Sequence, residues 1–172
     1  MIHPIRLHRC PSPALLGLAA LAALAACEGR TDSASQSSPL ELSYLATQYA
    51  AAWSGQVPEN LAAFYSADGS LSVNDGAPSV GREAIAATAR SFMEAFPDMV
   101  VVMDSVKGDA DHATFYWTWT GTNTGPGGTG RAVRLSGYEE WVLTSDGKIA
   151  ESMGHYDEAE YRRQVAGEGE GG

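Results

Sequence analysis

The chain has 172 residues, of which 44% are hydrophobic and 19% charged, and its formal net charge is −10. This acidic balance argues against nucleic acid as a partner, because binding to phosphates needs a basic surface. Both cysteines, Cys10 and Cys27, lie in or just after an apolar N-terminal stretch, so the rest of the chain can form no disulfide, and His112 and His155 alone make no metal-binding pattern.

The first 26 residues have the order of a secretory signal peptide. Arg6 and Arg9 precede an apolar run at Ala14–Leu24, and small residues follow. The run is shorter than the about 20 residues that a membrane-spanning helix needs. Removal of this segment takes away two arginines and no acids, so the formal charge of the mature chain becomes −12.

The segment ends in LAAC at residues 24–27, which resembles the lipobox of bacterial lipoproteins. That resemblance implies that Cys27 is acylated and becomes the first residue of a membrane-anchored chain. Glu28, where an aspartate would imply retention at the inner membrane, favours the periplasmic face of the outer membrane. The alternative is an ordinary signal peptide cut near Ala26, with Cys27 incidental.

Two further segments carry no apolar pattern. Residues 27–38 are small and polar, which is typical of a flexible tether between a lipid and a domain, and residues 167–172 are predicted to be a disordered tail. Between them, residues 39–166 have the length of one domain.

The first half of this domain has mainly helical patterns. The sequence SPLE at residues 38–41 is a capping box, and helical spacing of apolar residues then continues to about Ser54. A short helix is predicted at Pro58–Tyr65, a short strand at Leu71–Val73, and a long amphipathic helix at Gly81–Phe96.

The second half alternates with a period of two, which indicates strands. Four strands are predicted in hairpin order, followed by a short helix at Asp157–Val165. The strands are Met99–Val106, His112–Thr122, Ala132–Thr144 and Lys148–Tyr156. Helices are therefore largely separated from strands, which favours an α+β fold with helices on one face of a curved antiparallel sheet.

Several short motifs in this order resemble the SnoaL-like polyketide cyclases of the nuclear-transport-factor-2-like superfamily. They are GTNTG at 121–125, TGR at 129–131, DGKI at 146–149, Asp157, GR at 81–82 and FPD at 96–98. The resemblance covers about residues 41–165. It implies a cone-shaped fold in which long helices cover a bent sheet, an apolar pocket at the open end, and a homodimer formed through the outer sheet face. It implies no cofactor.

The cyclases use an aspartate on the last strand and a histidine on the preceding strand. Aligned on the shared DGKI, these positions fall on Gly154 and Glu140 in this chain. Glu140 is therefore the predicted general acid or base, since burial in an apolar pocket would raise its pKa, and Tyr138 on the same strand face is the predicted hydrogen-bond donor. The alternative is a structural Glu140 that pairs with Arg134 or lies on a solvated face.

The stretch around His155 and Asp157 has two interpretations. The two residues form an acid–base pair in one. In the other, the strand ends here and Asp157 caps the last helix, because Glu160 follows three residues later. The capping interpretation is the one that this pattern favours.

Three more residues occupy places where members of the superfamily line the pocket. These are Tyr49 and Trp53 on the first helix, and Asn74 after the first short strand. Core packing explains the two aromatic residues equally well, and Asn74 suits a turn.

These patterns predict a cell-envelope lipoprotein that binds a small apolar molecule in its pocket. The alternative is a cofactor-free isomerase, cyclase or hydrolase that uses Glu140 as its general acid or base.

Overall fold

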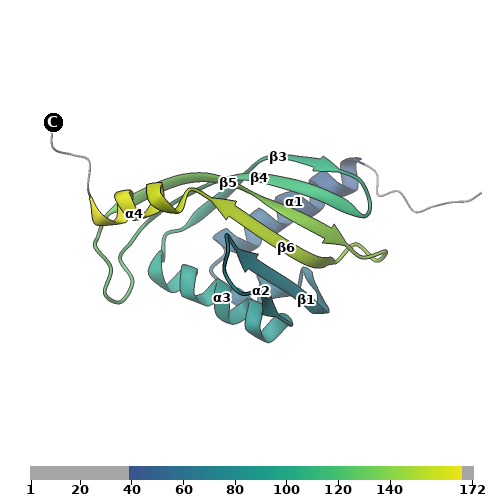
Figure 1. Cartoon of the computed structure of the whole chain (residues 1–172), viewed down its shortest axis with the longest axis horizontal. Coiled ribbons are helices and arrows are strands. Elements are labelled where there is room, and N and C mark those ends of the chain that lie inside the picture. Colours follow the sequence, from purple (N-terminus) through teal and green to yellow (C-terminus); the bar gives the residue numbers. More distant parts are fainter. Residues whose placement is uncertain (1–38, 168–172) are drawn as a thin grey trace, which may run out of the picture. The chain divides into compact units, whose positions relative to one another are not determined.

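The computed structural model describes residues 39–167 (Figure 1). The predicted signal peptide, Cys27, the tether and the tail beyond Gly167 lie outside the described residues. The helices are α1 (Pro39–Ser54), α2 (Pro58–Ala62), α3 (Arg82–Ala95) and α4 (Glu158–Ala166). The strands are β1 (Tyr65–Val73), β2 (Ser79–Val80), β3 (Val100–Gly108), β4 (His112–Thr122), β5 (Ala132–Leu143) and β6 (Ile149–Tyr156).

The strands form one curved sheet in the order β2-β1-β6-β5-β4-β3. The predicted α+β fold is confirmed, and β3 to β6 pair as consecutive antiparallel neighbours, as their patterns indicate. Two features were predicted incorrectly. β1 begins at Tyr65 rather than Leu71, and it pairs with β6 in parallel. Its register shifts between Tyr65 and Ser70, so its first half lacks the regular alternation that would identify a strand.

Helices α1, α2 and α3 lie on one side of the sheet (Figure 1). Helix α1 packs on β3, and α3 packs on α2 and β1. The end of α1 is fixed to β3 through Ser54, whose Oγ donates to the backbone oxygen of Val101 at 3.2 Å and accepts from its N–H at 2.9 Å. The inner face of the sheet is therefore buried beneath helices, and the candidate site lies in this layer.

Alternation along β5 decides which side chains face the helices. Val133, Leu135, Trp141 and Leu143 are buried, whereas Arg134, Ser136, Tyr138 and Glu140 are exposed. Odd-numbered residues therefore point inward, and Glu139 is among them. No helix within residues 39–167 is long and apolar enough to span a membrane.

Candidate functional site

A cavity of about 70 Å³ lies between the inner face of the sheet and helices α1 and α3. Phe92, Val101 and Tyr156 are partly exposed at its edge, whereas Trp117 and Glu139 are buried. Of the described residues in the lining, Glu139 alone is charged. The full lining is Trp53, Leu71, Val73, Phe92, Val101, Trp117, Trp119, Glu139, Gly154 and Tyr156.

The carboxyl group of Glu139 is held asymmetrically. Its Oε2 accepts hydrogen bonds from the Tyr49 hydroxyl at 2.9 Å, the Ser152 hydroxyl at 2.7 Å and the Trp141 indole at 3.1 Å. No residue of the described part donates a hydrogen bond to Oε1. Because Glu139 lines the cavity, Oε1 is the oxygen available to a molecule bound there.

The site holds Glu139 closer to its neutral form than a surface glutamate. Burial raises the pKa of its carboxyl group above the usual 4.5, and the three donors offset part of this rise by stabilising the charged form. Neutralisation by protonation is the expected response of a carboxylate buried without a cationic partner. A carboxyl group in this condition exchanges its proton at a higher pH than a surface glutamate does, which suits a general acid or base.

The raised pKa of Glu139 gives a stability prediction. Between pH 4.5 and the raised value, the folded protein holds a proton that the unfolded chain has released, so stability falls as pH rises through this window. Each unit of the rise contributes about 1.4 kcal/mol. The free energy of unfolding, measured with urea, should therefore fall less between pH 5 and pH 8 in Glu139→Gln than in wild type. Glu140→Gln should keep the wild-type difference, and an unchanged difference in Glu139→Gln would contradict this assignment.

The predicted position of Glu140 in the pocket was wrong by one residue. Glu140 lies on the outer face, where its side chain is 52% exposed and its Oε2 is 3.2 Å from Nε2 of His155. His155 also stacks on Tyr138, with ring centroids 4.7 Å apart. The expected pairing with Arg134 is not found among the described contacts, and the alternative of a solvated face fits. A shift of one residue along a strand moves a side chain to the opposite face.

Gly154 lies directly opposite Glu139 in the pairing of β5 with β6. A Cβ built on Gly154 would be 3.6 Å from Cγ of Glu139 and 3.5 Å from the backbone oxygen of Ser72, both ordinary contacts. The position to which the family resemblance assigned an aspartate therefore does adjoin the buried carboxyl group, but it carries no side chain. One acid, rather than two, occupies this point of the site.

The four predicted ligand-binding residues have separate positions. Trp53 lines the cavity. Tyr49 is fully buried and lies outside the lining, and its hydroxyl donates to the carboxyl group of Glu139. Tyr138 lies on the outer face. Asn74 ties β1 to the end of β6, since its Oδ1 accepts from Tyr156 N–H at 3.0 Å and its own N–H donates to the Gly154 oxygen at 2.7 Å.

An open groove on the molecule brings together four of the predicted residues, namely Asn74, Tyr138, His155 and Asp157. It has a volume of about 520 Å³. The groove lies beside the outer-face pair of Tyr138 and His155, whereas the buried acid lies on the inner face. The residues that were expected to surround one pocket are thus divided between two faces of the sheet.

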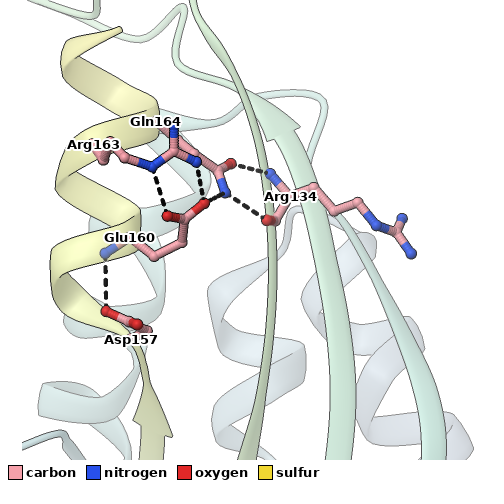
Figure 2. Close-up of polar contacts among 5 residues, drawn as sticks. All are labelled: Arg134, Asp157, Glu160, Arg163 and Gln164. Carbon is pink, nitrogen blue, oxygen red and sulfur yellow. Dashed lines mark hydrogen bonds and ion pairs between the residues drawn. The ribbon is translucent and has the colours of Figure 1, made fainter. Parts of the chain in front are cut away.

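Asp157 caps helix α4, as the favoured interpretation predicts. Its Oδ1 accepts the backbone N–H of Glu160 at 2.9 Å (Figure 2). Figure 2 also shows how α4 is attached to β5. The side-chain amide of Gln164 accepts from the Arg134 N–H at 2.7 Å and donates to the Arg134 oxygen at 2.9 Å, as a neighbouring strand would. Among the described contacts, none joins Asp157 to His155, whose Nε2 lies 3.2 Å from Oε2 of Glu140 instead.

Replacing Asp157 separates its two interpretations. Asp157→Ala should lower the free energy of unfolding by about 1 kcal/mol, because the cap is lost. Asp157→Asn should have a free energy of unfolding within about 0.3 kcal/mol of wild type, because asparagine also caps helices. Chemical denaturation measures both. Both variants should bind a cavity ligand as wild type does. Loss of ligand binding in the stable Asp157→Asn variant would restore a functional role for this carboxylate.

Two indole groups at the cavity lack partners. Nε1 of Trp117 and Nε1 of Trp119 are both buried, and no described residue accepts a hydrogen bond from either. Both rings belong to the lining. Burying an N–H without a partner costs about 1–3 kcal/mol, so these groups would gain from an acceptor in a rearranged, ligand-bound site.

The sequence pointed to Glu139 only indirectly. Alternation of the apolar residues Val133, Leu135 and Trp141 on β5 predicts that residue 139 faces inward with them. Ser152 and Tyr65 complete the polar cluster and have no signal of this kind. The pairing of β1 with β6 shifts register just after Tyr65, and the pairing of β5 with β6 shifts register just before Ser152. Within residues 39–167, no three potential metal ligands come together.

Comparison with known proteins identifies relatives of the whole fold. The family described as SnoaL-like domain matches residues 46–152. No curated protein matches the chain. Among solved structures, a protein with a ketosteroid isomerase-like fold from Catenulispora acidiphila, in complex with trimethylamine, is 21% identical, with a TM-score of 0.64, covering 71% of this chain and 92% of its own.

Two further structures differ in the activity that is named for them. AclR from Streptomyces galilaeus, a candidate hydroxylase, is 22% identical with a TM-score of 0.66, over 78% of this chain and 87% of its own. A candidate SnoaL-like polyketide cyclase from Jannaschia sp. CCS1 is 16% identical with a TM-score of 0.62, over 73% and 94%. These likenesses establish the fold, and the fold alone does not select one activity.

Proposed function

The chain belongs to the SnoaL-like domain family, and on that premise we propose that it binds a small, mostly apolar molecule in its cavity and exchanges a proton with that molecule through Glu139. One observation carries the proposal. A buried carboxyl group in the lining of an apolar cavity has one oxygen that accepts three hydrogen bonds, while no described residue donates to the other. The reaction class is acid–base transfer without a cofactor, such as an isomerisation, cyclisation or hydrolysis.

The lining supports a neutral ligand. It contains no basic side chain, so an anion would find no counter-charge and would face a carboxyl group. A protonated Glu139 can donate a hydrogen bond to a carbonyl oxygen, and an ionised Glu139 can remove a proton from a carbon next to that carbonyl. The volume of about 70 Å³ favours a small molecule or one end of a larger one.

The absence of a side chain at Gly154 favours a second candidate function, a binder without catalysis. Chemistry that needs a separate acid and base has only Glu139 at this point of the site. A single carboxyl group can still both deliver and recover a proton, which is why proton exchange remains the first proposal. The two candidates differ in whether a bound ketone exchanges its protons with solvent.

The four tryptophans provide the assay. Trp53, Trp117 and Trp119 line the cavity, and Trp141 donates to Glu139. We expect cyclopentanone to shift their indole N–H signals in an ¹⁵N-labelled sample, and acetate to shift none. Trimethylamine, the molecule named with the Catenulispora structure, serves as a cationic probe, because an alkylamine is protonated near neutral pH and would pair with an ionised Glu139.

Deuterium uptake into the bound ketone then separates catalyst from binder. Uptake that depends on the protein supports acid–base catalysis, and binding without uptake supports the second candidate. Failure of every neutral probe to shift an indole signal would contradict both.

We also propose that the chain is anchored at the cell envelope through an acylated Cys27. The support is the order of Arg6, Arg9, the apolar run at Ala14–Leu24 and LAAC at 24–27. Cys27→Ser should release the protein from the membrane fraction into the soluble periplasmic fraction. Mass spectrometry of the wild-type N-terminus should find a lipid on Cys27, and an unmodified cysteine there would contradict the proposal.

The outer sheet face supports a homodimer. Val100 and Val102 on β3 are 47% and 53% exposed, and Tyr116 and Tyr138 on neighbouring strands are 36% and 38% exposed. Apolar side chains gathered on one face are typical of an interface. Sedimentation equilibrium of the wild type should give a dimer and Val102→Glu a monomer, whereas a monomeric wild type at every concentration would contradict this.

A further inference from the structure

Two buried tyrosine hydroxyls form a chain behind Glu139. The hydroxyl oxygens of Tyr65 and Tyr49 are 2.7 Å apart, and the Tyr49 hydroxyl donates to Oε2 of Glu139 at 2.9 Å. Each tyrosine has one hydroxyl proton. Because Tyr49 gives its proton to Glu139, Tyr65 must donate to the oxygen of Tyr49, and the chain runs from Tyr65 through Tyr49 to Oε2.

The direction of hydrogen-bond donation along this chain does not change over the pH range where Glu139 titrates. Both rings have no solvent exposure, and burial, with the nearby Glu139, raises the pKa of each hydroxyl well above its usual 10.0. Neither tyrosine therefore ionises in the range where Glu139 titrates. Tyr65 is fixed from the other side as well, since its backbone oxygen accepts from Nε of Arg82 at 2.8 Å.

The chain has a consequence for the proton of Glu139. Tyr49, Ser152 and Trp141 all donate to Oε2, so that oxygen has no good position left for a proton. We propose that Tyr65, acting through Tyr49, is a positioning residue that keeps the proton of Glu139 on Oε1, the oxygen available to the cavity. This inference rests on the proposed role of Glu139 as the proton-exchanging group.

The other groups around Glu139 do not offer a competing explanation. Tyr49 from α1 and Tyr65 from β1 are the titratable side chains facing it, while Ser152 from β6 and Trp141 from β5 do not titrate in this range. Across the described residues, no charged side chain forms an ion pair or hydrogen bond with Glu139. A purely structural Tyr65 would fill space with its ring, so the test must remove the hydroxyl and keep the ring.

The indole N–H of Trp141 reports the charge of Glu139 directly, because it donates to Oε2 at 3.1 Å. Its proton chemical shift is followed against pH in the folded full-length protein, for the wild type, Tyr65→Phe and Tyr49→Phe. Removing the Tyr65 hydroxyl weakens Tyr49 as a donor, so the ionised carboxylate loses stabilisation and its apparent pKa should rise by about 0.5 unit. Tyr49→Phe removes a direct donor and should raise it by about 1 unit.

Two comparisons make the result specific. Tyr161→Phe removes a hydroxyl outside this chain and should leave the midpoint unchanged. The double variant Tyr49→Phe/Tyr65→Phe should shift it by less than the sum of the two single shifts, because Tyr65 acts on Oε2 through the hydroxyls that it contacts, mainly Tyr49 and also Ser152. The proposal would be overturned if the titration midpoint of folded Tyr65→Phe equalled that of wild type. It would also be overturned if the shifts of the two single variants added in the double variant.

If Tyr65→Phe fails to fold, 3-fluorotyrosine placed at position 65 keeps the ring and the hydroxyl and makes a stronger donor. The midpoint should then fall, and no change would overturn the proposal. The titration needs no ligand, so it is separable from the proposed function. If the predicted pKa shifts occur but no ligand binds, the proposed function is rejected and the positioning role of Tyr65 stands. If a ligand binds but the shifts are absent, the positioning role is rejected and the proposed function stands.

Discussion

Glu139→Gln is expected to reduce deuterium uptake into a bound ketone by about 100-fold or more, because general acid–base catalysis by one group is typically worth 10²–10⁴-fold. Glu140→Gln, one residue away, is expected to stay within about twofold, since that side chain is 52% exposed on the outer face. Uptake is followed by NMR in deuterated buffer. Equal losses in both variants, or full activity in Glu139→Gln, would contradict the assignment.

Glutamine is the suitable replacement because it preserves the polar cluster. Its carbonyl oxygen can accept the three donors that now point at Oε2, and its amide then occupies the place of Oε1. Glu139→Leu would instead leave the hydroxyls of Tyr49 and Ser152 and the Trp141 indole without an acceptor. Each orphaned group costs about 1–3 kcal/mol, so that variant tests stability rather than chemistry.

Gly137→Ala is expected to destabilise the fold by about 3 kcal/mol, at the upper end of the usual cost of overpacking. A Cβ on Gly137 would overlap the backbone oxygen of His155 and lie 2.5 Å from Cζ2 of Trp117. Trp117 faces Gly137 in the pairing of β4 with β5, and the ring occupies the space that the missing side chain leaves. The same change should displace Trp117 and weaken ligand binding.

Gly154→Ala is the matched control on the neighbouring strand. Its Cβ would meet only ordinary contacts at 3.5 and 3.6 Å, so stability should stay within about 1 kcal/mol of wild type. Urea unfolding of both variants measures the difference. A Gly137→Ala protein as stable as Gly154→Ala would show that the packing of Trp117 against the glycine is not tight.

The sequence predicted the strand that carries the candidate site but not the residue of that strand that lies in it. The strand β5 was predicted almost to the residue, and its alternation assigns Glu139 to the buried face with Leu135 and Trp141. The prediction of Glu140 came instead from the family alignment on DGKI at residues 146–149. An alignment error of one residue reverses the face of a strand, whereas the apolar periodicity of the strand itself does not depend on relatives.

The polar cluster around Glu139 was beyond prediction because it depends on distant pairings. Tyr65 reaches the site through β1, whose parallel pairing with β6 joins segments about 80 residues apart and shifts register on the way. Tyr65 was expected in a helix, where its hydroxyl would have no fixed partner. Tyr49 was expected to line the pocket, whereas it is fully buried and absent from the cavity lining, and its hydrogen bond to Glu139 could be identified only from three-dimensional contacts.

The central claim is that Glu139, and not Glu140, is the buried acid of the cavity. Carbon-13 NMR of glutamate-labelled protein, titrated across pH, tests it most directly. We predict a carboxyl signal with a midpoint above the ordinary 4.5 that is absent in Glu139→Gln and retained in Glu140→Gln. A raised signal that survives in Glu139→Gln, or that disappears in Glu140→Gln, would contradict the account.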